Sequence, residues 1–202
     1  MKIAIIKYNA GNVQSVLYAL QRLGVNAVVT DDPEEIKEAD KVIFPGVGNA
    51  SSAMEHLKKT GLDELIISLK QPVLGICLGL QLLCKKSEEG DTKCLGIFDV
   101  DVKKFENSFQ SENSLLFKIP HMGWNTIYDL RSPLFSGVKE NSFVYFVHSY
   151  YAELSTQTIA TTDYIISFSA AIQKDNFYGV QFHTEKSADA GIQIISNFLK
   201  LA

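Results

Sequence analysis

The chain has 202 residues, of which 46% are hydrophobic and 21% are charged, and it carries a formal net charge of −4. This length fits a single domain, residues 1–202, that buries about 70% of its unfolded surface without a metal or disulfide staple. The negative charge argues against nucleic acid as a partner, and the lack of any run of about 18 apolar residues argues against a membrane span, so we expect a cytoplasmic protein.

The N-terminal part of the chain predicts strands that alternate with helices. Apolar runs predict strands at residues 2–8, 26–30, 41–44 and 73–76. Helical patterns predict helices at residues 13–23, 51–59 and 62–69, and a further short helix that begins at residue 32. This alternation predicts an α/β fold with a mostly parallel sheet flanked by helices. We expect residues 9–12, 45–48 and Cys77 to cluster, because ligands bind at the carboxyl ends of such strands.

The pattern changes after residue 97. Strand-like segments follow one another with little helix between them, at residues 98–105, 124–130, 143–151, 158–166 and 170–181. We therefore expect an antiparallel, strand-rich C-terminal half. Residues 106–113 and 131–142 are rich in polar and turn residues and predict surface loops, and residues 189–201 predict a closing amphipathic helix.

One stretch joins an apolar strand to a helix through a lone cysteine. Cys77 lies between Gly75 and Gly79, which is the cysteine form of a nucleophile elbow. The glycines are needed because side chains there would collide with the neighbouring strand and helix. At a helix N-terminus the sulfur is favoured as a thiolate. The alternative is an ordinary buried cysteine, so the elbow needs a base and an orienting acid elsewhere in the chain.

Residues 179–187 supply both groups. At the end of a strand, residues two apart point the same way, so His183 and Glu185 project together with Thr184 opposed. Glu185 would hold one imidazole nitrogen while the other faces the sulfur. A strand-end histidine beside a solvated glutamate is the alternative, and the elbow cysteine in the same chain favours a triad instead.

The remaining motifs exclude other chemistries. The cysteines are odd in number and lack the spacing of metal ligands, so we expect one reactive thiol, two inert ones, no disulfide and no metal site. The loop glycines Gly46 and Gly48 lack the rest of a P-loop or dinucleotide fingerprint. We therefore expect no cofactor.

Three motifs carry a family resemblance. Residues 45–48 (PGVG), 75–81 (GICLGLQ) and 181–185 (QFHTE) together resemble the class I, triad-type glutamine amidotransferases. Residues 8–12, 120–125 and 145–150 are similar to the glutaminase subunits of imidazole glycerol phosphate synthases, and the similarity spans the chain. The resemblance implies a flavodoxin-like class I glutaminase fold. Two features depart from it: Thr184 replaces a usual proline, and Lys7 and Asn9 replace a common aspartate and glycine.

The resemblance also implies a reaction and the residues that perform it. Cys77 would attack the side-chain amide of glutamine, His183 would protonate the departing ammonia, and Glu185 would orient the imidazole. The oxyanion would be held by the N–H of Leu78 and by the loop at Val47 and Gly48. The residues implied to hold glutamine are Gly48, Gly79, Gln81, Glu89, His148, Ser149 and Tyr150.

A separate partner is implied as well. Ammonia would pass to a (β/α)8-barrel cyclase subunit that makes imidazole glycerol phosphate and aminoimidazole carboxamide ribotide. The residues at family positions near that interface are Asn12, His121, Trp124, Tyr145 and Lys186. Gly46 and Gly48 would let the peptides around Val47 turn, so that docking of the partner could complete the oxyanion site.

Three alternatives remain at this point. A paralogous glutaminase that feeds a surface-sugar amidotransferase would share the triad and the interface motifs. A stand-alone cysteine hydrolase would be fully active without a partner. A flavodoxin-like binding module would explain the sheet but would leave Cys77, His183 and Glu185 unexplained.

Overall fold

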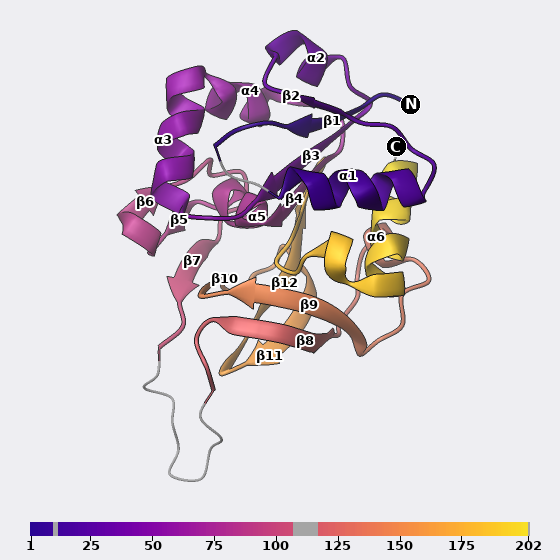
Figure 1. The fold of residues 1–202 in the computed structure, drawn as a ribbon. Helices are drawn as coiled ribbons and strands as arrows, with labels where there is room; N and C mark the ends of the chain where they lie inside the picture. The colour runs from indigo at the N-terminus through magenta and orange to yellow at the C-terminus, as the bar shows by residue number, and fades with distance from the viewer. Residues whose placement is uncertain (10–11, 107–116, 202) are drawn as a thin grey trace.

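The structure is a computed structural model, and it describes residues 1–9, 12–106 and 117–201. A seven-stranded sheet with strand order β11-β12-β13-β4-β3-β1-β2 forms its centre (Figure 1). Five neighbouring strands are parallel: β2 (Val28–Thr30), β1 (Ile3–Ile6), β3 (Lys41–Gly46), β4 (Val73–Cys77) and β13 (Phe177–Val180). The other two, β12 (Ile166–Lys174) and β11 (Thr158–Tyr164), are antiparallel. The predicted α/β class is confirmed.

Helices cover both faces of the sheet. One face carries α1 (Val13–Arg22) and α6 (Ala188–Lys200), and the other carries α3 (Ala50–Thr60), α4 (Leu62–Ser68) and α5 (Leu78–Leu83) (Figure 1). The short helix α2 (Pro33–Lys37) follows β2. Because both faces are covered, β1, β3 and β4 are buried along their whole length, which explains why their sequences read as continuous apolar runs.

Local sequence signals set the helix boundaries. The Asn49 side chain accepts hydrogen bonds from the N–H groups of Ser51 and Ser52 and so begins α3, which ends at Gly61 with φ 72°. The side chain of Asp32 caps α2 in the same way. The helices predicted at residues 51–59 and 62–69 are confirmed.

Two smaller sheets lie below the carboxyl edge of the main sheet as Figure 1 presents it. One is an antiparallel ribbon of β8 (His121–Ile127) and β9 (Ser142–His148). The other has the order β10-β7-β5-β6, with bounds β10 (Tyr150–Ala152), β7 (Asp101–Lys104), β5 (Lys86–Ser87) and β6 (Thr92–Lys93). Three 3-10 helices complete the described elements: η1 (Glu89–Asp91), η3 (Pro133–Phe135) and η4 (Thr184–Lys186).

Two of the single strands predicted in the C-terminal half are each divided in the structure. The strand expected at residues 143–151 is two strands, β9 and β10, which lie in different sheets. The single strand expected at residues 170–181 is two strands, because Asp175 adopts a left-handed φ of 51° and turns the chain. The second of them, β13, pairs with β4 in parallel, so the half is not antiparallel throughout. This pairing brings the chain that follows β13 to the carboxyl edge beside Cys77.

Other boundaries also differ from the predictions. Strand β3 extends through Pro45 to Gly46, which pairs with Cys77, so the predicted loop begins two residues later. The two-residue strands β5 and β6 are too short to show a periodicity, and η3 interrupts the predicted loop at 131–142. Of the loop predicted at 106–113, residues 107–113 lie outside the described residues. In the described ranges, no helix combines the length and apolarity needed to cross a membrane.

Candidate active site

Cys77 occupies a sharp turn between β4 and α5. Its φ of 55° and ψ of −109° lie in a region that L-residues rarely adopt, and such strain is typical of functional positions. A Cβ at Gly79 would collide with the carbonyl oxygen of Phe44, and one at Gly75 would come within 2.7 Å of the Leu83 side chain. The predicted elbow, and the predicted need for both glycines, are therefore confirmed.

A cavity of about 390 Å³ opens beside the sulfur. Cys77 is 6% exposed and lines this cavity together with residues from the loop after β3, from α5, from η1 and from the end of β9. The other lining residues are Val47, Gly48, Leu78, Gln81, Glu89, Pro120, Val147, His148, Ser149, Tyr150 and His183. Most of the residues predicted from the sequence to hold glutamine thus meet at one site.

His183 and Glu185 form a buried pair. The Nδ1 atom of His183 lies 2.8 Å from Oε1 of Glu185, and both side chains are almost completely buried. The pair does not lie on a strand as predicted: β13 ends at Val180, and the 3-10 helix η4 turns the Glu185 carboxylate back onto the imidazole. The predicted contact is correct, although its structural cause is a tight turn.

The other side of the imidazole is available for chemistry. The Nε2 atom of His183 is buried and has no hydrogen-bond partner among the described residues, and His183 lines the same cavity as Cys77. Burial lowers the pKa of His183, but Cys77 and Glu185 outweigh this effect and raise the pKa to about 10. His183 is therefore an imidazolium at neutral pH and has a proton to donate.

A buried cysteine, a charged imidazole and an orienting carboxylate in one cavity form the set of groups that acyl transfer requires. A sequence model of the family described as "Glutamine amidotransferase class-I" matches residues 4–202. The chain belongs to the class I glutamine amidotransferases. Among the described residues, no group of three or more His, Cys, Asp and Glu side chains is arranged to hold a metal ion in this amidotransferase.

Curated relatives and solved structures extend the comparison. This amidotransferase is 62% identical over 201 residues to the imidazole glycerol phosphate synthase subunit HisH of Bacteroides fragilis, and 59% identical to that of Bacteroides thetaiotaomicron, with 100% of each chain covered. A glutamine amidotransferase from Thermotoga maritima shares its fold at a TM-score of 0.62 and 19% identity, over 99% of this chain and 83% of that one. Another glutamine amidotransferase reaches 0.70 at 15% identity, over 98% and 97% of the two chains.

The oxyanion donors predicted for this amidotransferase border the cavity. Leu78 is the first residue of α5, so its N–H has no partner within the helix. Gly48 has a φ of 112°, which L side chains rarely adopt, and it lines the cavity beside Val47. The hydroxyl of Tyr8 donates to the Pro45 carbonyl at 2.7 Å and holds the end of β3.

Two of the residues predicted to hold glutamine have structural roles. Gly79 does not line the cavity, and its role is to let α5 pack against the Phe44 carbonyl. Glu89 borders the cavity, and its carboxylate accepts the N–H of Ala50 at 2.6 Å, where α3 begins. The side-chain amide of Gln81 donates to the Tyr150 carbonyl and to Gln181.

Gln181 is a site residue that was not predicted from the sequence. Gln181 is fully buried, and its amide contacts the Cys77 sulfur at 3.8 Å as well as Gln81. Its position at the end of a strand, two residues before His183, is the signal that could have found it. Val147 was missed too, and its carbonyl lies 3.9 Å from the same sulfur.

His121 and His148 form a neutral hydrogen-bonded chain. The Tyr150 carbonyl can only accept, so Nδ1 of His148 carries the proton, and Nε2 accepts from Nδ1 of His121 at 3.1 Å. Burial lowers the pKa of His121 to about 4 and that of His148 to about 3. Both ring nitrogens of His148 are therefore engaged within the protein, and the ring forms a wall of the cavity.

The residues predicted for a partner interface lie in three different places. His121 is only 3% exposed, so its side chain does not lie on the surface, because its ring packs between Phe146 and Tyr164. Trp124 is 52% exposed and contacts the Tyr145 ring edge-on, and the ammonium of Lys186 lies 6.0 Å from the same ring. Asn12 is half-buried at the start of α1, outside the cavity.

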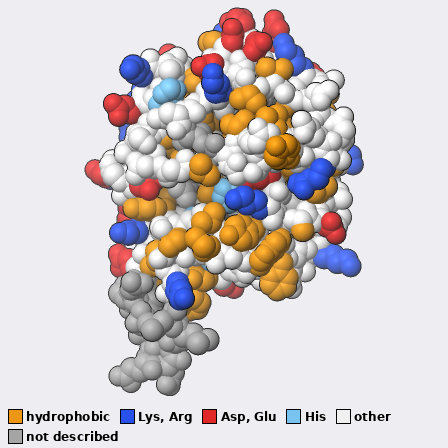
Figure 2. Space-filling model, in the orientation of Figure 1, with side chains coloured by type: hydrophobic (Ala, Val, Ile, Leu, Met, Phe, Trp, Pro, Cys, Tyr) orange, Lys and Arg blue, Asp and Glu red, His pale blue; other side chains and the backbone are white. Residues whose placement is uncertain are grey.

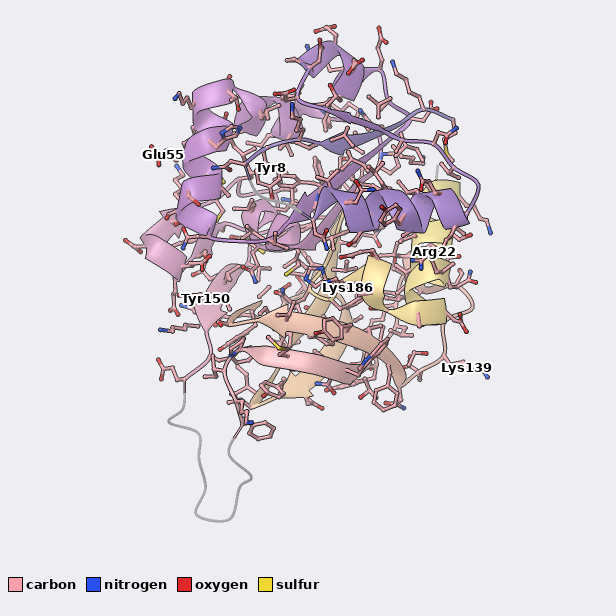
Figure 3. All side chains as sticks on the ribbon, in the orientation of Figure 1. Tyr8, Arg22, Glu55, Lys139, Tyr150 and Lys186 are labelled. Carbon is pink, nitrogen blue, oxygen red and sulfur yellow. The ribbon has the colours of Figure 1, made fainter. Side chains whose placement is uncertain are left out.

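The outward face of β8 and β9 carries exposed apolar side chains. Met122 is 63% exposed and Phe143 is 61% exposed, and both were missed by the sequence analysis. Together with Trp124, Tyr145 and Lys186 they form what we call the β8–β9 patch. Figure 2 shows hydrophobic side chains gathered over these strands, and Figure 3 shows Lys186 between them and α1. Such a patch on a surface is typical of an interaction site.

Proposed function

We propose that this amidotransferase is the glutaminase subunit of an imidazole glycerol phosphate synthase, working as one domain in the cytoplasm. It would hydrolyse glutamine and deliver ammonia to a separate cyclase subunit that makes imidazole glycerol phosphate and aminoimidazole carboxamide ribotide. The observation that carries the hydrolysis is the shared cavity of Cys77 and the His183–Glu185 pair. The identity of 62% to a relative of that name favours this partner over a surface-sugar amidotransferase.

In the first half of the proposed reaction, the Cys77 thiolate attacks the side-chain carboxamide carbon of glutamine. The tetrahedral intermediate collapses when the C–N bond breaks and the His183 imidazolium gives its proton to the departing nitrogen. Ammonia leaves, and the glutamyl group remains on sulfur as a thioester. The pKa of about 10 suits His183 to carry this proton.

In the second half, water enters the cavity. Neutral His183 accepts a proton from the water as its oxygen attacks the thioester carbon, and the C–S bond breaks to release the thiolate and a carboxylic acid. The new carboxyl group then loses its remaining proton to solvent, which gives glutamate. Glu185 holds Nδ1 at 2.8 Å, so that Nε2 serves both half-reactions. The starting charges on Cys77 and His183 are then restored.

Charge that develops on the carbonyl oxygen requires aimed donors. We assign the free N–H of Leu78 as one donor and the peptide between Val47 and Gly48 as the other. Removal of one such donor typically slows catalysis by about 10²–10³. Rotation of the Val47–Gly48 peptide would therefore be enough to switch the enzyme.

We assign substrate binding to the remaining polar wall of the cavity. The Glu89 carboxylate suits the α-ammonium of glutamine, and the main chain of Ser149 and Tyr150 supplies further polar groups. Gln81 fixes that main chain through its bond to the Tyr150 carbonyl at 2.9 Å. The cyclase subunit would dock on the β8–β9 patch, beside the cavity.

The experiment that tests this function measures glutamate release by the isolated chain, by its complex with the cognate cyclase, and by the complex with cyclase ligand. We expect release to be lowest in the first and highest in the third, because docking would bias the loop that contains Gly48. Equal release in all three would favour a stand-alone hydrolase instead.

A further inference from the structure

The main chain of His183 is held to β9 at two points. The N–H of His183 donates to the carbonyl of Tyr145 at 2.9 Å, and the His183 carbonyl accepts a hydrogen bond from the Ser187 hydroxyl at 2.6 Å. The same hydroxyl accepts from the N–H of Tyr145 at 3.0 Å. Ser187 therefore closes a ring of hydrogen bonds between one residue of β9 and the histidine of the site.

Ser187 does not do what its position predicts. A serine at the N-cap of a helix normally accepts a hydrogen bond from the N–H two or three residues later. Ser187 is the N-cap of the 13-residue helix α6, yet its side chain makes no capping bond. The hydroxyl is fully buried and uses both its donor and its acceptor on His183 and Tyr145.

The neighbouring turn is packed to support this arrangement. A Cβ at Gly191 would collide with the Thr184 carbonyl and lie 2.9 Å from the Ser187 Cβ, so only glycine lets α6 approach η4 this closely. The N–H of Ser187 also donates to the Thr184 carbonyl at 3.2 Å. The turn that carries His183 is thus fixed by α6 on one side and by β9 on the other.

We propose that Ser187 is a positioning residue for the glutaminase reaction, and that it locks the His183 main chain to the strand on which the partner docks. The Tyr145 side chain lies in the β8–β9 patch, against Trp124 and near Lys186. A shift of β9 on docking would therefore move the His183 backbone with it, because Tyr145 holds that backbone directly and through Ser187. This proposal rests on the proposed role of His183.

The test replaces Ser187 with alanine and compares this variant with the same replacement at a matched serine. Ser187→Ala removes the bridge and leaves the Tyr145 N–H without its acceptor. Ser169→Ala is the control, because Ser169 is also fully buried and donates to a main-chain carbonyl, that of Glu153, at 2.7 Å, but lies in β12 outside the cavity. Ser187→Thr keeps the hydroxyl and tests rescue.

Two readouts follow in the complex with cyclase and its ligand. We expect Ser187→Ala to lower kcat about 10- to 100-fold, since small displacements of a catalytic group cost factors of this size, with KM for glutamine and Kd for the cyclase within about twofold. Ser187→Thr should recover most of the loss, and Ser169→Ala should stay within about twofold of wild type. An unchanged kcat in Ser187→Ala, or an equal loss in Ser169→Ala, would overturn the proposal.

A third readout does not depend on the synthase. In the isolated chain, iodoacetamide should alkylate Cys77 about tenfold more slowly in Ser187→Ala, because a displaced His183 ring lies less close to the attacking sulfur in the cavity that the two residues share. Burial raises the pKa of Cys84 and raises that of Cys94 to about 12, so these thiols react slowly. An unchanged alkylation rate would also overturn the proposal.

The outcomes separate this inference from the proposed function. If the wild-type complex releases no glutamate, the proposed function fails, while the alkylation rates still report how Ser187 positions His183. If Ser187→Ala does not fold, Ser187→Cys takes its place, because a thiol fills the space but donates a much weaker hydrogen bond. The same losses are then expected, and wild-type rates would refute the inference.

Discussion

The replacement Glu185→Gln tests the buried carboxylate without changing its shape. A glutamine oxygen can still accept from Nδ1 of His183, where Glu185 Oε1 now lies at 2.8 Å, but the negative charge is lost. A hydrogen bond to a charged group contributes about 1.5–3 kcal/mol and a neutral one about 0.5–1.5, so the imidazolium loses about 1–2 kcal/mol of support. At about 1.4 kcal/mol per tenfold change in rate, kcat should fall about 5- to 30-fold.

The assay is glutamate release by the complex with cyclase ligand, measured as kcat against pH. The pKa of His183, raised to about 10 by Cys77 and Glu185, should fall in the variant, so the alkaline limb of the profile should move to lower pH. His183→Ala should cost more, about 10²–10⁴, because the proton donor itself is gone. Equal losses in the two folded variants would refute Glu185 as the orienting group.

A matched control makes the same chemical change elsewhere. Glu38 is exposed and pairs with Lys2 at 2.9 Å, away from the cavity. Glu38→Gln should leave kcat within about twofold of wild type, since exposed ion pairs contribute little. A comparable loss in this control would show that the assay reports general destabilisation.

Three further predictions concern the loop, the turn and the buried histidines. Gly48→Ala should reduce the stimulation of glutamate release by cyclase ligand about tenfold, because alanine is strained at φ 112°. Assembly with the cyclase should be unchanged. If the stimulation is also unchanged, this loop is not the switch. Thr184→Pro should leave kcat unchanged and alter the unfolding free energy by at most about 1 kcal/mol. Thr184 begins η4, its buried hydroxyl has no hydrogen-bond partner in the part of the chain that the structure describes, and His183 at ψ 99° suits a residue before proline. A tenfold loss of kcat would contradict this. His121 and His148 stay neutral in the folded protein but gain protons below about pH 6.5 in the unfolded chain. The free energy of unfolding measured in urea should therefore be about 2 kcal/mol lower per histidine at pH 5 than at pH 7. A His148→Gln variant with the wild-type pH dependence would refute this.

The elements that the sequence predicts well are those with strong local signals. The elbow at Cys77 follows from glycines whose absent side chains avoid specific clashes, and Asn49 caps α3 by a bond to nearby residues. Such features depend on neighbours along the chain. They could therefore be predicted without the fold.

The features that the sequence did not predict depend on distant contacts. The parallel pairing of β13 with β4 is set by tertiary structure, and Gln181 reaches the Cys77 sulfur only because of that pairing. His121 stands at a family position near the partner interface, but its ring is buried in an aromatic cluster. The diversion of the Ser187 hydroxyl from helix capping to the main chain of His183 is likewise visible only in the fold.

In the proposed function, Cys77 performs the glutaminase step while the acceptor chemistry lies on another subunit. The most direct measurement is imidazole glycerol phosphate synthesis by the Cys77→Ala complex, with glutamine or with ammonium salt as the nitrogen source. We predict that synthesis from glutamine is lost and that synthesis from ammonia stays at the wild-type rate. Retained synthesis from glutamine, or loss of the ammonia-dependent reaction in an intact complex, would contradict the assignment.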